Sequence, residues 1–421
     1  MALQSKTRRL GIAVLLFATT LATGCAPRVR VVEVEVTVAP QISVIEVTAT
    51  AMPTSAPATV TVCANGCDFV TIQAAVDDIG TIAGFTINVT DAIHTEAGIT
   101  VNKDVIIQGE GTDSTIVQAH DMLDGAPDRV FFITNGAAVT IRGMTIRHGN
   151  PPVHPQSGGG IYNDDFCILT LEDSVITKNV ASDGAGIYNK GAVVLTNCTI
   201  SDNVADGIED PGHECGNGGG IKNVGDGTVM LTNCTISGNS AVGNGGGIKG
   251  NCGGTVEVVN STISDNSAVF RGGGVFVMGT VTIVNSTIAD NSAEGIGRDT
   301  AISNAGGGVW IAGTLSFTNT IIANNTTRVS TGGDCAIGSE GTIDANANNL
   351  IGDDSCGPDY SGNPLLGPLA DNGADTQTHA LLPGSPVIDV IPADECVVDT
   401  DQRGVSRPQG MACDIGAYEM Q

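Results

Sequence analysis

The sequence predicts an all-β chain folded as a right-handed parallel β-helix, a solenoid of short stacked strands with a helical cap at its N-terminal end. Two observations lead to this prediction. An internal repeat fills the centre of the 421-residue chain, and the repeat shows no helical periodicity. Its segments instead alternate in polarity, as in V-T-I-V-N-S-T-I at 281–288, and Asn and Gly turns separate them.

The repeat contains two series of β-branched residues. The first series follows the glycine clusters and consists of Ile161, Ile187, Ile221, Ile248, Val275 and Val309. The second consists of Ile146, Ile176, Ile200, Ile236, Ile263, Ile288 and Ile322. An asparagine follows each member of the second series closely, at Asn150, Asn179, Asn203, Asn239, Asn266, Asn291 and Asn325. We expect these amides to stack inside the solenoid, each hydrogen-bonded to its copies in the neighbouring coils.

The region before the repeat contains a short helical pattern. In T-I-Q-A-A-V-D-D-I, the residues Ile72, Ala75, Val76 and Ile79 recur at helical spacing, and Thr71 is a suitable N-cap. A helix here would cover the open end of the solenoid. Such a cover is needed because a bare core and unpaired strand edges recruit other chains.

The N-terminus has the features of an export signal over residues 1–24. Basic residues precede an apolar run from Leu10 to Ala22 that is too short for a membrane span of about 20 residues. The run ends on L-A-T-G-C, which resembles the lipobox of bacterial lipoproteins and implies a lipid on Cys25; ordinary cleavage with a free Cys25 is the alternative. Residues 25–59 then form an extended linker, 60–335 the β-helix, and 336–421 a last coil and a disulfide-stapled tail.

The chain is strongly acidic, with a formal charge of −27. Loss of residues 1–24 takes this charge to −30, which is 15 basic minus 45 acidic residues. Nucleic acid is therefore not an expected partner. Weak Ca²⁺ binding at exposed carboxylates is compatible with the charge, but no calcium-loop motif is present, so no cofactor is expected.

Twelve cysteines in an exported chain favour disulfides over thiol chemistry. The expected pairs are Cys63 with Cys67, Cys335 with Cys356, and Cys396 with Cys413. Zinc is the alternative for the first pair, although no second pair of ligands has tetrahedral-site spacing. Cys198 and Cys234 share one position of the repeat, either as stacked core thiols or as a disulfide between coils. The sequence also leaves open how three further cysteines are paired, Cys167, Cys215 and Cys252.

Two parts of the chain resemble known families of surface proteins. The G-G-G-I and I-x-x-N signals over about 140–330 resemble the repeats of polymorphic outer-membrane proteins. The tail, with N-L-I-G-D, T-H-A-L-L-P-G-S-P-V-I-D, D-Q-R-G-V-S-R-P and C-D-I-G-A-Y-E, resembles the C-terminal region of choice-of-anchor bacterial β-helix proteins. That resemblance implies a β-helix displayed at the cell surface, which agrees with an N-terminal lipid.

The tail also contains charged residues with expected structural roles. His379 belongs to the tail pattern and is expected to be structural. Arg403 and Arg407 are expected to pair with Asp401 or Asp414 and so to lock the tail.

The parallel β-helix also supports pectate lyases and polygalacturonases, so the fold alone does not decide between an enzyme and a binding protein. Hydrolysis needs paired carboxylates across the scissile bond, and a lyase needs acidic calcium ligands beside a basic proton acceptor. The sequence displays neither arrangement. Asp164 and Asp165 are interpreted as a polar turn between strands.

One position of the repeat does indicate binding. The residue after each member of the first series should face outward, because neighbouring residues of a strand point to opposite sides. These residues are Tyr162, Tyr188, Lys222, Lys249, Phe276 and Trp310. We expect an exposed stripe of flat rings and lysines along which a polysaccharide lies. The alternative is that the side chains stack on each other, or under the insertion loops at 204–217 and 292–305, and only stabilise this face.

The leading functional hypothesis is a monomeric, lipid-anchored protein of the cell envelope or surface. It would adhere to a polysaccharide or to the surface of another cell without catalysing a reaction. The alternative is an extracellular polysaccharide lyase or glycoside hydrolase of pectin-lyase-like fold, and a third hypothesis is a passive spacer. Acidic residues clustered near Lys or Arg would favour the enzyme, and an uninterrupted aromatic stripe would favour binding.

Overall fold

The computed structural model describes residues 58–421, except for 79, 82, 153–155, 208–215, 297–304 and 329–331. The chain divides into two units, Met1–Thr50 and Ala51–Gln421, and all described residues belong to the second. The expected signal, Cys25, nearly all of the linker, Ile79 and Cys215 lie outside the described residues. Within the described part, no helix is both long and apolar enough to cross a membrane.

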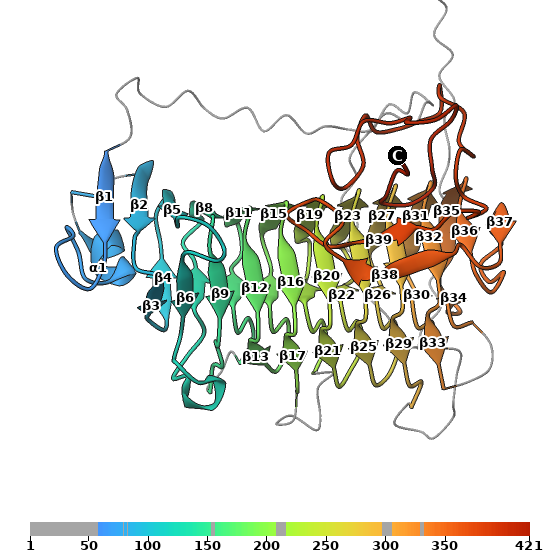
Figure 1. Cartoon of the computed structure of the whole chain (residues 1–421). Coiled ribbons are helices and arrows are strands. Elements are labelled where there is room, and N and C mark those ends of the chain that lie inside the picture. The colour runs from blue at the N-terminus through green and yellow to red at the C-terminus, as the bar shows by residue number, and fades with distance from the viewer. Residues whose placement is uncertain are drawn as a thin grey trace, which may run out of the picture. The chain divides into compact units, whose positions relative to one another are not determined.

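The described residues form a stack of coils in which strands of successive coils pair in parallel (Figure 1). A typical coil passes through four sheets, named here C, A, B and D in chain order. Sheet A contains β1 (Thr59–Val62), β2 (Phe85–Val89), β5 (Val105–Gln108), β8 (Ala138–Arg142), β11 (Ile168–Glu172), β15 (Ala192–Thr196), β19 (Thr228–Thr232), β23 (Thr255–Val259), β27 (Thr280–Val284), β31 (Thr314–Thr318) and β35 (Thr342–Ala347).

The other three sheets run beside sheet A. Sheet B contains β3 (Ile93–Thr95), β6 (Ile116–Gln118), β9 (Thr145–Arg147), β12 (Val175–Thr177), β16 (Thr199–Ser201), β20 (Thr235–Ser237), β24 (Thr262–Ser264), β28 (Thr287–Ala289), β32 (Ile321–Ala323), β36 (Leu350–Ile351) and β37 (Tyr360–Ser361). Sheet C contains β4 (Ile99–Val101), β7 (Phe131–Ile133), β10 (Ile161–Asn163), β14 (Ile187–Asn189), β18 (Ile221–Asn223), β22 (Ile248–Gly250), β26 (Val275–Val277), β30 (Val309–Ile311) and β34 (Cys335–Ile337). Sheet D contains β13 (Val180–Ala181), β17 (Val204–Ala205), β21 (Ser240–Ala241), β25 (Ser267–Ala268), β29 (Ser292–Ala293) and β33 (Thr326–Thr327).

The interior of the stack is one apolar core that extends from Val62 to Ile351. Both predicted series of Ile and Val residues are fully buried in it. Alternation places them inside, and because the coils are in register, equivalent side chains stack directly on each other. The predicted solenoid of stacked strands is confirmed.

An asparagine ladder runs through the turn after sheet B. Each Nδ2 donates to the Oδ1 of the next asparagine at 2.9 Å, and the members are Asn179, Asn203, Asn239, Asn266, Asn291 and Asn325. The ladder ends on the carboxylate of Asp334, at 3.0 Å from Asn325. At the other end Gly149 occupies the position and its N–H donates to Asn179, so the expectation that Asn150 belongs to the ladder is wrong.

A second asparagine ladder was not anticipated. It lies at the end of the sheet C strands, where Asn163 donates to Asn189 and Asn189 donates to Asn223, each at 2.8 Å. The side-chain N–H groups of Asn163 and Asn189 are thereby paired from one coil to the next, which fixes the register of successive coils.

The N-terminal end of the solenoid is covered by α1 (Ile72–Asp77). Thr71 is its N-cap and accepts from the Ala74 N–H at 3.0 Å, as expected. The Glu96 carboxylate accepts from the N–H groups of Ile72 and Gln73 at 2.6 and 2.9 Å. A 3₁₀ turn, η1 (Leu123–Gly125), lies in the loop before β7.

Strands β34 to β37 form the other end of the stack. Apart from the first residue of β34, they lie in the region 336–421 that was expected to contain the last coil. Strand β35 is the last of sheet A, and its pairing with β31 contains a register shift beside Asp344. A charged bulge on an edge strand discourages pairing with another chain.

The tail after Ser361 folds back over the outer side of sheet B (Figure 1). It includes an antiparallel pair, β38 (Leu366–Ala370) and β39 (Thr378–Leu381). Its residues Val387, Ile391 and Ile415 form a second apolar cluster with Ile321 of β32. The tail is thereby part of the same folded body as the coils from β20 to β36.

The three disulfides expected from spacing are present in the structure, Cys63–Cys67, Cys335–Cys356 and Cys396–Cys413. Cys252 is also disulfide-bonded. Disulfides are typical of proteins outside the reducing cytoplasm, so the chain is an extracellular protein.

The remaining described cysteines are buried thiols. Cys198 and Cys234 are free, so the alternative of a disulfide between these coils is wrong. Burial and the neighbouring Cys234 thiol raise the pKa of Cys198, which keeps it an inert part of the core. Cys167 is likewise free and buried.

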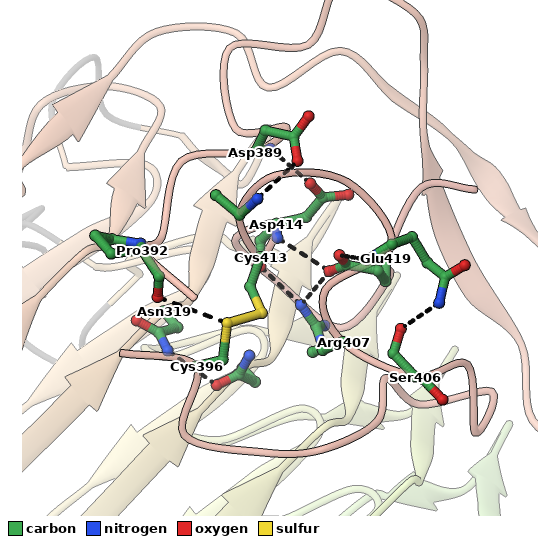
Figure 2. The surroundings of a disulfide bond; sticks show 12 residues. Asn319, Asp389, Pro392, Cys396, Ser406, Arg407, Cys413, Asp414 and Glu419 are labelled. Carbon is green, nitrogen blue, oxygen red and sulfur yellow. Dashed lines mark hydrogen bonds and ion pairs between the residues drawn. A yellow bond between two sulfur atoms is a disulfide. The ribbon is translucent and has the colours of Figure 1, made fainter. Parts of the chain in front are cut away.

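The tail is locked by buried charges around the Cys396–Cys413 disulfide (Figure 2). Arg403 pairs with Asp401 at 2.7 Å, as expected. Arg407 instead pairs with Glu419 at 2.9 Å and contacts Asp414 through the main-chain oxygen, at 2.7 Å. The prediction that Arg407 pairs with the carboxylate of Asp401 or Asp414 is therefore wrong, because its partner is Glu419.

Candidate ligand-binding face

The six residues of the predicted stripe lie in one row across sheet C. Register pairs Tyr162 with Tyr188, then Lys222, Lys249, Phe276 and Trp310 in succession. Phe132 of β7 extends the row by one position, because it pairs with Tyr162. We call these seven side chains the sheet C ladder. Sequence reasoning missed Phe132 because its coil lacks the glycine cluster, although F-F-I before an N-G turn is the same pattern.

The ladder is less exposed than expected. Tyr162, Lys222, Lys249 and Phe276 expose only 5, 8, 3 and 5% of their surfaces, so the prediction of an exposed stripe is wrong for these four residues. Tyr188 and Trp310 are partly exposed, as is Phe132. The reason is the spacing of the coils, about 4.8 Å, at which large side chains cover the faces of their neighbours.

Ring stacking occurs in two separate groups. Tyr162 stacks on Tyr188 with centroids 4.9 Å apart and planes 22° apart. Phe276 stacks on Trp310 at 4.7 Å and 13°. Lys222 and Lys249 separate the two groups, so the aromatic stripe is interrupted. The alternative in which the side chains stack on each other therefore holds for these two ring pairs.

Cationic side chains lie over the rings. The Arg271 guanidinium lies 4.7 Å from the Trp310 centroid, and the Arg129 guanidinium lies 5.1 Å from that of Tyr162. Lys190 adds its ammonium at 5.8 Å from the Tyr162 ring. Sequence reasoning missed these three residues because none falls in the outward position of sheet C. Their distances are in the range of cation–π contacts.

Acidic residues pair with these cations. Lys190 Nζ lies 3.2 Å from Asp164 and 3.1 Å from Asp165. Lys222 Nζ lies 2.8 Å from Asp183, and both side chains are nearly buried. Carboxylates within reach of a lysine are the feature expected of the enzyme alternative, so this cluster needs a chemical test.

Lys190 is poorly suited to accept a proton. Burial lowers its pKa, but hydrogen bonds to Asp165 and Asp164 and the proximity of Tyr162 outweigh burial, and the pKa is raised. Burial also raises the pKa of Tyr188 to about 12. A general base should have a pKa near the working pH, so both groups stay protonated, and Lys190 donates to Asp164 and Asp165.

Asp164 and Asp165 occupy the turn between β10 and β11, as predicted. Within the part of the chain that is described, no group of three or more His, Cys, Asp or Glu residues is arranged to hold a metal ion. His379 lies away from this face, buried between tail and sheet B, with Nε2 at 2.8 Å from Ser264 and Nδ1 at 2.8 Å from the Gly367 oxygen.

Comparison with known proteins agrees with this architecture. A family model described as a right-handed β-helix region matches residues 129–327. Among solved structures, pectate lyase Pel9A is 15% identical over 87% of this chain and 98% of that chain, with a TM-score of 0.48. Pectin methylesterase PemA from Erwinia chrysanthemi is 14% identical over 77% of this chain and 86% of that chain, with a TM-score of 0.31.

A third similar structure is the A-module of the mannuronan C-5 epimerase AlgE4 of Azotobacter vinelandii. It is 14% identical over 69% of this chain and 94% of that chain, with a TM-score of 0.30. A search of curated proteins found no match. Identities this low concern the fold and not the activity. The stacked parallel strands and the matching family model make the chain a right-handed parallel β-helix protein, and its disulfides are those of an extracellular protein.

Proposed function

We propose that this protein is a lipid-anchored surface protein that binds a polysaccharide along the sheet C ladder without changing it chemically. The observation that carries the proposal is the alignment of aromatic side chains in one row, with Tyr188 and Trp310 partly exposed. Flat rings offer apolar faces and edges to sugar rings, while the nearby Asp and Lys side chains offer hydrogen-bond partners.

The anchor belongs to the same proposal. A lipid on Cys25 would hold the protein in a membrane, and the 25–59 linker would raise the β-helix above it. The Cys25→Ala variant should then move from the membrane fraction to the soluble fraction of fractionated cells. Retention of that variant in the membrane would contradict the lipid anchor and leave the binding proposal in place.

The binding proposal is tested with the double variant Tyr188→Ala with Trp310→Ala. Electrophoresis through gels that contain acidic or neutral polysaccharides measures affinity as retarded migration. We expect the double variant to lose affinity by about tenfold or more, since each ring contact contributes about 1 kcal/mol.

The matched control is Phe166→Ala with Tyr360→Ala, which removes two rings that are 91 and 39% exposed and lie outside the ladder. This control should bind as the unchanged protein does. Equal binding by both double variants would sink the ladder as the binding face. Release of reducing or unsaturated sugar ends by the unchanged protein would instead establish the lyase or hydrolase alternative.

A further inference from the structure

We infer that the polysaccharide held by the sheet C ladder is neutral and not polyanionic. The inference rests on the proposed function, because it names the chemical class of the ligand at the same site. It follows from how the positive charges of the ladder are compensated and from the charge of the surrounding protein.

Three of the cations beside the rings, Lys190, Lys222 and Arg129, are paired with carboxylates of the chain itself. Lys190 contacts two carboxylates, those of Asp164 and Asp165, at 3.2 and 3.1 Å. Lys222 contacts Asp183 at 2.8 Å. Arg129 contacts Asp128 at 3.2 Å. An anionic polymer would have to displace these carboxylates or approach beside them, and like charges in contact are costly.

The exposed parts of these pairs are more acidic than basic. The Asp165 side chain is 59% exposed, whereas that of Lys190 is 31% exposed. The Asp128 side chain is 46% exposed against 8% for Arg129, while Lys222 and Asp183 are about equally covered, at 10 and 11%. Beside Lys190 and Arg129, a ligand therefore meets a carboxylate that is more exposed than its cationic partner.

The wider electrostatic field has the same sign. The chain has a formal charge of −27, and a charge of this size repels polyanions over the distance set by ionic screening. Carboxylate oxygens are acceptors, and the hydroxyl groups of a neutral sugar are donors. The partly exposed rings of Tyr188 and Trp310 complete a surface of acceptors and apolar edges, which suits a neutral polymer rich in hydroxyl groups.

The test compares two neutral polymers, xylan and a soluble β-glucan, with two acidic ones, polygalacturonate and alginate. The purified protein is run through gels that contain each polymer, with a chelator present so that Ca²⁺ cannot bridge two sets of carboxylates. We expect retention by at least one neutral polymer, and affinity at least about tenfold weaker for both acidic polymers. Retention by the neutral polymer should change less than about twofold when NaCl is increased, because no ion pair is formed.

A charge variant sharpens the test. Asp164→Asn with Asp165→Asn leaves Lys190 without its two acidic partners, so the ratio of affinity for the acidic polymers to affinity for the neutral polymer should rise by about tenfold. The charge-matched control is Asp394→Asn with Glu395→Gln in the exposed part of the tail, which should change neither affinity.

The outcomes separate this inference from the proposal on which it rests. Preferred retention by an acidic polymer, lost at high salt, would overturn the neutral class and keep the binding function. Retention by none of the four polymers would overturn the binding function, and the inference would fall with it.

Discussion

The outward-facing side chains of sheets B and C are covered by different parts of the chain. On sheet C the outward side chains are large, and they cover each other through stacked rings and overlying cations. On sheet B the outward side chains are small, chiefly threonines and serines, and the tail covers them. One face is therefore complete within the repeat, whereas the other depends on residues more than one hundred positions further along the chain.

The covering of sheet B stops where the tail stops. Thr235 and Thr262 are fully buried, and their hydroxyls donate to Gln377 and Gln402 of the tail at 2.6 and 2.7 Å. Thr199, in the same row one coil earlier, is only partly buried. The same residue type in the same position of the repeat thus has two different environments, and the difference comes from a distant segment.

The largest expected effect is on the covered face. Arg407→Ala removes the partner of Glu419, which is 1% exposed, and also removes donors to the main-chain oxygens of Asp414 and Gly416. Breaking a buried ion pair on one side costs about 3–5 kcal/mol. We expect a loss of this size in the free energy of unfolding in urea, with faster hydrogen exchange in β20 and β24 as the tail detaches.

Arg328→Ala is the control, since Arg328 is exposed and surface substitutions cost less than about 0.5 kcal/mol. Equal losses in the two variants would mean that the tail charges do not hold the cover in place. Sheet B would then have to bury its threonines for another reason.

Most of the solenoid was predictable because its signals are local and repeated. The two series of Ile and Val, the row of sheet C, the N-cap at Thr71 and the three disulfides all follow from spacing alone. The same residue pattern occurs in many coils of the repeat, so a chance match in one coil has little influence on the predicted fold. The second asparagine ladder was visible as well, as I-Y-N and I-K-N, but its meaning required the stacked coils.

The predictions that were wrong concern features that the repeat pattern does not contain. Alternation gives the direction of a side chain but not what covers it, so Tyr162 and Phe276 were expected to be exposed. The partner of Arg407 is set by the path of an irregular loop, and spacing gave the wrong acid. The prediction for Asn150 was wrong by one residue, since Gly149 occupies the ladder position.

A smaller effect is expected on the self-covered face. Phe276→Leu keeps an apolar side chain beneath Lys249 but removes the ring that stacks on Trp310. Aromatic pairs contribute about 0.5–1.5 kcal/mol beyond their buried area, so unfolding should cost about 1 kcal/mol less. Phe166→Leu, at a side chain that is 91% exposed, should leave the unfolding free energy unchanged. A loss as large as that of Arg407→Ala would show that the ladder is as critical a support as the tail.

The smallest expected effect concerns Asp334, which ends the asparagine ladder in the last coil and is 3% exposed. Burial raises its pKa from 3.8 to about 6, against the hydrogen bonds from Asn325 that lower it. The folded state therefore binds the proton more tightly than the unfolded state, and stability increases as the pH falls through about 6, with the gain complete below 3.8. Between pH 7 and pH 5 this gain should be about 1 kcal/mol.

Other groups titrate in the same range, so the measurement is a difference between proteins and not a single pH profile. The stability gained from pH 7 to pH 5 should be smaller in Asp334→Asn than in the unchanged protein, whereas Asp344→Asn, at an exposed position of the same coil, should keep the full gain. An equal gain in all three would show that the proton is not taken up at the end of the ladder. The last coil would then be stabilised in the same way as the coils before it, by amides and apolar packing alone.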